Sequence, residues 1–149
     1  MEENNYLYGF NNICFYSSSF FIINVSVSLH YKDYIYCFLF ASLLITSYIS
    51  HYTQNVYIIL LDKTNIGFVI LYGGYQYVNK SLYYYDKCNN DKHKVYCIYF
   101  IPVSFFLVSY FYLSGIAINP IVICDIKGNW VHCFIHIISS IAHNLIIIL

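Results

Sequence analysis

Five polar residues stand in segments that are otherwise almost wholly apolar: Ser47, His51, Asp62, His132 and His136. An ionisable or metal-binding side chain within hydrocarbon is costly, so each of them is a candidate functional residue. His132 and His136 are four residues apart, as are Ser47 and His51, so on a helix each pair points to the same side. Two histidines from one helix and a third from a neighbour form a zinc site whose fourth position stays open for water. The pattern predicts a catalytic zinc site in which Asp62 orients a histidine or holds that water.

The composition is that of a membrane protein. Hydrophobic residues make up 60% of the 149 residues and charged residues only 9%, against about 25% charged in a typical soluble domain. A helix needs about 20 apolar residues to cross a bilayer, and five stretches approach this length: 13–29, 34–50, 56–78, 95–118 and 130–149. We therefore predict an all-α fold, a polytopic transmembrane helix bundle of about five spans that forms a single membrane-embedded domain over residues 1–149.

The charged residues indicate an orientation and exclude one class of partner. Seven basic and seven acidic residues balance, and no basic stripe is present, so nucleic acid is not an expected partner. The stretch 79–94 carries Lys80, Lys87, Lys92 and Lys94. Short Lys-rich loops tend to stay cytoplasmic. This arrangement predicts a lumenal N-terminus and a cytosolic C-terminus.

The candidate residues are expected to lie at one depth in the membrane. His51 lies at the exit of the second expected span, Asp62 lies in the second turn of the third, and His132 and His136 lie in the first two turns of the last. All of these positions fall on the lumenal side. At a rise of about 1.5 Å per residue, Asp62 and His136 each lie roughly 9 Å below the start of their span. We expect these side chains to meet.

The same residues carry a resemblance to a known family. Ser47-Tyr-Ile-Ser-His51, the step to Asp62 and the His132-Cys-Phe-Ile-His136 segment together resemble the alkaline ceramidase family, whose superfamily includes the adiponectin and progestin receptors. The resemblance implies a zinc-dependent amidase of the endoplasmic reticulum or Golgi membrane that takes ceramide from surrounding membrane lipids. The products would be a sphingoid base and a fatty acid. It also implies that His51, His132 and His136 hold zinc and that Ser47 and Asp62 are catalytic.

The N-terminal segment is similar to the family in a weaker way. Ceramidases carry a calcium site there, and the matching positions are Glu2 and Asn4. The family has an acidic residue just before the position of Phe15, whereas Ile13 and Cys14 stand there in this chain. We interpret the cysteines that lie in or beside apolar stretches as small hydrophobic residues.

The chain departs from the family in length. Family members have seven spans, whereas only the stretch 95–118 lies between the third expected span and the HxxxH segment. The loss of two spans preserves the parity of the crossings, so the candidate residues still reach one face. Two alternatives to a ceramidase stay open: a related lipid hydrolase or receptor of the same superfamily, and a degenerate membrane protein that kept the motif without activity.

Overall fold

The computed structural model describes residues 12–53, 55–87, 92–118 and 126–149. These parts of the chain form helices joined by short turns, and they contain no strand. The helices are α1 (Asn12–Ser18), α2 (Phe21–His30), α3 (Tyr34–Thr53), α4 (Val56–Lys87), α5 (Lys92–Ile118) and α6 (Ile126–Ile148). The predicted all-α bundle is confirmed.

Four of these helices, α3 to α6, are long and apolar enough to cross a membrane, as expected for an integral membrane protein. They correspond to four of the five expected spans. The expectation for 13–29 differs from the structure, because this stretch forms two helices, α1 with 7 residues and α2 with 10. Neither reaches the length of about 20 residues that a spanning helix needs. The bundle therefore has four spanning-length helices and a broken N-terminal segment.

Serine side chains explain the break between α1 and α2. The hydroxyls of Ser17 and Ser18 both donate to the carbonyl oxygen of Cys14, at 2.9 and 3.0 Å. Such bonds compete with the helical pattern and bend helices. The backbone N–H groups of Ser19 and Phe20 then bond to carbonyls three residues earlier, at 3.1 Å each, which is the tighter spacing of a 3₁₀ turn. The α-helical pattern is interrupted at this point.

The next turn reverses the chain so that α2 packs against α3. Lys32 adopts a left-handed conformation with φ 60°. The side chain of Asp33 then caps α3, because its Oδ1 accepts a hydrogen bond from the backbone N–H of Tyr36 at 3.1 Å. Asn55 caps α4 in the same way, with Oδ1 2.9 Å from the backbone nitrogen of Tyr57.

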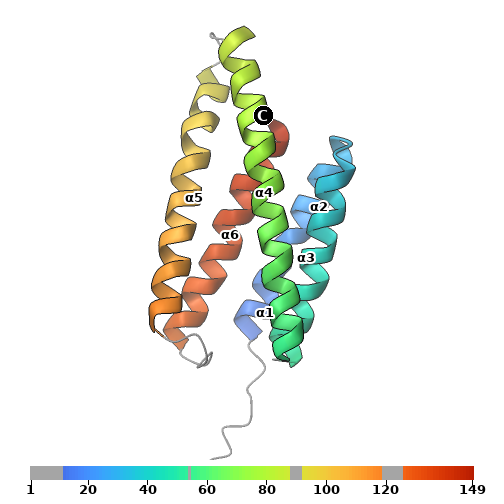
Figure 1. Cartoon of the computed structure of the whole chain (residues 1–149), viewed down its shortest axis with the longest axis vertical. Coiled ribbons are helices and arrows are strands. Elements are labelled where there is room, and N and C mark those ends of the chain that lie inside the picture. Colours follow the sequence, from blue (N-terminus) through green and yellow to red (C-terminus); the bar gives the residue numbers. More distant parts are fainter. Residues whose placement is uncertain (1–11, 54, 88–91, 119–125) are drawn as a thin grey trace, which may run out of the picture.

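Helix α6 makes the most connections in the bundle, with contacts to α1, α2, α4 and α5. Helix α3 packs between α2 and α4 and also contacts α1. Figure 1 shows that α1, the last turns of α3 and the first turns of α4 and α6 lie at the same end of the molecule, the lower end in that view. The topology thus brings the segments that carry the candidate residues to one end.

The described interior is rich in small polar side chains, while many large apolar side chains face outward. Ser18, Asn24 and Ser47 are fully buried, whereas Phe38 and Phe106 are more than 70% exposed. Small residues that hydrogen-bond between helices are typical of membrane bundles, where lipid covers the apolar exterior. The arrangement fits the membrane assignment.

Candidate metal site

The structure brings the rings of His51, His132 and His136 together. His51 comes from the last turn of α3, and the other two lie one turn apart on α6. The ring centroid of His51 lies 5.1 Å from that of His132 and 5.7 Å from that of His136, and the two α6 rings are 4.5 Å apart. The spacing of four residues on α6 places both rings on the side that faces α3.

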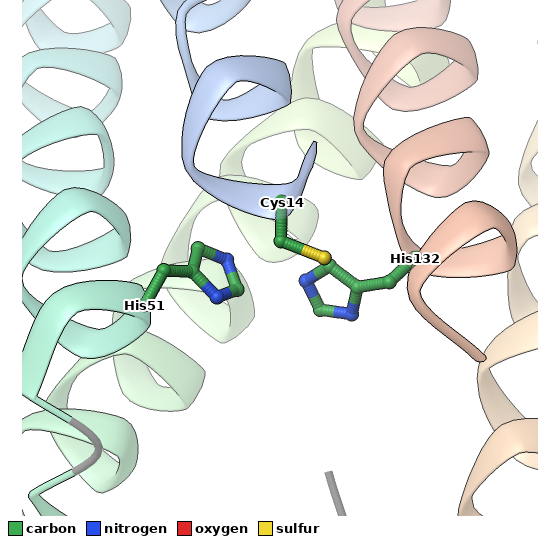
Figure 2. Close-up of side chains that lie close together, drawn as sticks. All are labelled: Cys14, His51 and His132. Atoms are coloured by element: carbon green, nitrogen blue, oxygen red, sulfur yellow. The ribbon is translucent and has the colours of Figure 1, made fainter. Parts of the chain in front are cut away.

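Cys14 on α1 lies beside two of these histidines, His51 and His132. Its sulfur, one ring nitrogen of His51 and one of His132 all lie within 4.8 Å of one another. Figure 2 shows the His51 and His132 rings pointing toward each other, with the Cys14 side chain reaching from α1 into the space between them. Cys14 is only 1% exposed. These three residues could hold a metal ion.

One nitrogen of the cluster is buried without a partner. Within the described part of the chain, Nε2 of His51 makes no hydrogen bond. Leaving a buried polar atom unsatisfied costs roughly 1–3 kcal/mol, and a bound metal ion would satisfy it. Imidazole nitrogen and thiolate sulfur are ligands that zinc favours. The donor set therefore fits zinc.

The tautomer of His136 depends on the direction of its hydrogen bond with Ser17. Ser17 Oγ lies 2.9 Å from both the carbonyl oxygen of Cys14 and Nδ1 of His136, and the hydroxyl has a single proton. When that proton goes to the Cys14 carbonyl, Nδ1 of His136 is the donor to Ser17. A neutral imidazole protonated on Nδ1 keeps the lone pair of Nε2, which is the form that binds metal. Ser17 is therefore placed to orient the His136 ring.

Asp62 and Ser47 are both buried near this end of the bundle, outside the group of three potential ligands. Asp62 accepts a hydrogen bond from the Thr46 hydroxyl at 3.3 Å. Ser47 lies 2.8 Å from the Ser18 hydroxyl, whose own proton goes to the Cys14 carbonyl. When the Ser18 proton goes to that carbonyl, Ser47 is the donor in the contact between the two hydroxyls.

Sequence reasoning missed Cys14 and Ser17, and it left their region without a role at the site. A signal for both was present, because Cys14, Ser17 and Ser18 are spaced three and four residues apart and so share one helix face. The expected calcium positions, Glu2 and Asn4, lie outside the described residues.

Comparisons of the chain with protein-family models, with curated proteins and with solved structures find no match. The resemblance to alkaline ceramidases therefore rests on the motif residues alone.

Proposed function

We propose that this chain is an intramembrane zinc-dependent amidase that hydrolyses ceramide to a sphingoid base and a fatty acid. The observation that supports it most is the convergence of three histidine rings from α3 and α6. One of these rings, His51, has a buried Nε2 without a hydrogen-bond partner among the described residues. The substrate class comes from the motif resemblance. A site inside a bundle of apolar helices suits a substrate that resides in the membrane.

In this proposal His51, His132 and His136 hold the zinc ion. When bound, zinc polarises a carbonyl and lowers the pKa of water to about 7. The Ser17 bond to Nδ1 of His136 fixes the orientation of one ligand ring. Neutral imidazoles are the form that binds the ion.

Asp62 is the proposed acid–base residue. Its buried carboxylate would take a proton from the attacking water. That proton then passes to the amide nitrogen as the carbon–nitrogen bond breaks, which gives the free amine and the carboxylic acid. Ser47 is the proposed donor to the oxyanion. Its hydroxyl oxygen lies 2.8 Å from that of Ser18, so in this role its proton would point away from Ser18.

The test is the release of sphingoid base from ceramide by the purified, zinc-loaded chain in detergent. We expect turnover by the wild type and a decrease of about 10²- to 10⁴-fold in Asp62→Asn, with zinc retained, because a general acid–base residue contributes on that scale. Asp33→Asn is the matched control. Asp33 caps the first turn of α3, at the opposite end of that helix from His51. This variant should hydrolyse ceramide like the wild type.

Two results would count against the proposal. Zinc-loaded wild type that releases no sphingoid base would rule out ceramide amidase activity. Equal turnover by Asp62→Asn and the wild type would remove Asp62 from the mechanism.

A further inference from the structure

Cys14 has no part in a site made of three histidines and water, yet its sulfur lies among the candidate ligands. Around tetrahedral zinc, with bonds of about 2.0–2.3 Å, neighbouring ligand atoms are roughly 3.3–3.7 Å apart. The chosen atoms of Cys14, His51 and His132 already lie within 4.8 Å of one another. Side-chain adjustments of about 1 Å would therefore bring all three to bonding distance of a single ion.

We propose that Cys14 is a ligand to the same metal ion as the histidines and completes a four-ligand Cys–His₃ site. This inference rests on the zinc site of the proposed function. Zinc sites with four protein ligands are closed, whereas hydrolytic sites keep one position for water. The thiolate of Cys14 thus occupies the position that water needs, and hydrolysis requires Cys14 to leave the ion.

Hydrogen bonds hold α1 in this closed arrangement. The carbonyl oxygen of Cys14 accepts from Ser17 and Ser18. Ser17 in turn contacts His136 on α6, and Ser18 contacts Ser47 on α3. Helix α1 is therefore fastened to both helices that supply histidines. A displacement of α1 would free the coordination position and the Ser47 hydroxyl together. Movement of α1 would therefore switch the site between a closed and an open form.

The side chain of Cys14 can be changed without removing these bonds, because they involve its backbone carbonyl. Cys14→Ala and Cys14→Ser are therefore suitable variants, and helical content with thermal unfolding in detergent checks that each is folded. Cys37→Ala is the matched control. Cys37 lies 14 residues before His51 on α3, about 21 Å away along the helix axis.

The experiment is X-ray absorption spectroscopy of the zinc-loaded proteins. We expect a sulfur neighbour at about 2.3 Å in the wild type and in Cys37→Ala. Cys14→Ala and Cys14→Ser should show only nitrogen and oxygen neighbours, at about 2.0–2.2 Å. A wild-type spectrum without sulfur, or a sulfur shell that persists in Cys14→Ala, overturns the inference.

Ceramide hydrolysis by the same samples separates this inference from the proposed function. Faster hydrolysis by Cys14→Ala than by the wild type supports the closed site. A sulfur shell in the wild type with no hydrolysis by any variant keeps the Cys14 assignment and overturns the amidase. Hydrolysis by a wild type that lacks the sulfur shell does the reverse, and protein that takes up no zinc overturns both.

Discussion

Helix α6 carries histidines in two contrasting environments. His143 is 1% exposed, its Nδ1 lies 2.9 Å from the Tyr36 hydroxyl, and its ring packs against Phe40 and Phe105 at centroid distances of 5.3 and 5.0 Å. Its surroundings are aromatic rings and a hydroxyl. His132, three turns earlier, faces other imidazoles and a thiol.

The difference shows how environment separates a structural histidine from a candidate metal ligand on the same helix. A buried imidazole next to a hydroxyl is satisfied by protein alone. In the cluster at the other end of α6, by contrast, the buried Nε2 of His51 has no hydrogen-bond partner among the described residues. The His143 end of α6 therefore serves packing, and the His132 end is the candidate for metal binding.

The strongest test of this contrast compares His132→Ala with His143→Ala. Removal of His132 takes away a ligand, so we expect bound zinc to fall from about one ion per chain to nearly none. Removal of His143 should leave the zinc content unchanged and lower the thermal stability. Elemental analysis of both purified variants, after dialysis against a weak chelator, measures the difference. Equal zinc contents would erase the distinction between the two ends.

The sequence predicted the long helices well because apolar runs report directly on burial in hydrocarbon. It underestimated α4, which was expected over 56–78 and extends to Lys87. Hydropathy indicates which residues lie in the hydrocarbon region. A helix can continue through polar residues outside that region, as α4 does after residue 78. The break between α1 and α2 was missed for another reason. Serine is nearly neutral on hydropathy scales, and its effect here comes from side-chain bonds to the Cys14 carbonyl.

At the site, the spacing of four residues and the shared depth were enough to anticipate that the three histidines lie together. The neighbours of the histidines could not be anticipated in this way. Ser17 and His136 are 119 residues apart, and their contact depends on how α1 packs against α6. The thiol of Cys14 was interpreted as a hydrophobic group, since its chemistry depends on which side chains face it.

A smaller effect is expected from the packing that encloses His143. A Cβ atom on Gly73 would lie 2.6 Å from Cε1 of His143 and 2.7 Å from the Tyr36 hydroxyl oxygen, whereas one on Gly74 would meet nothing within 4 Å. Gly73→Ala should therefore destabilise the bundle by about 1–3 kcal/mol, as overpacking does. Gly74→Ala should be neutral or stabilising, because alanine favours helix over glycine by roughly 1 kcal/mol.

Unfolding of both glycine variants in detergent micelles measures these changes, and zinc content is read on the same samples. Both variants should keep their zinc, since Gly73 adjoins the structural histidine and not the cluster. Loss of zinc in Gly73→Ala with Gly74→Ala unaffected would mean that the two ends of α6 are coupled.

The smallest effect sharpens the contrast within the metal-binding end itself. Ser17→Ala removes the hydrogen-bond partner of His136 Nδ1, and loss of such a partner lowers metal affinity by about 10- to 100-fold. Ser18→Ala is the matched control. Both variants lose one bond to the Cys14 carbonyl and one contact with a neighbouring helix, but only the Ser17 contact is with an imidazole. Competition with a chromophoric chelator measures the zinc affinity of each variant.

We expect a loss of zinc affinity at the lower end of this range for Ser17→Ala, about tenfold, because water can replace the lost hydroxyl. A larger loss in Ser18→Ala would show that the position of α1, and not the tautomer of His136, governs how tightly the ion is held.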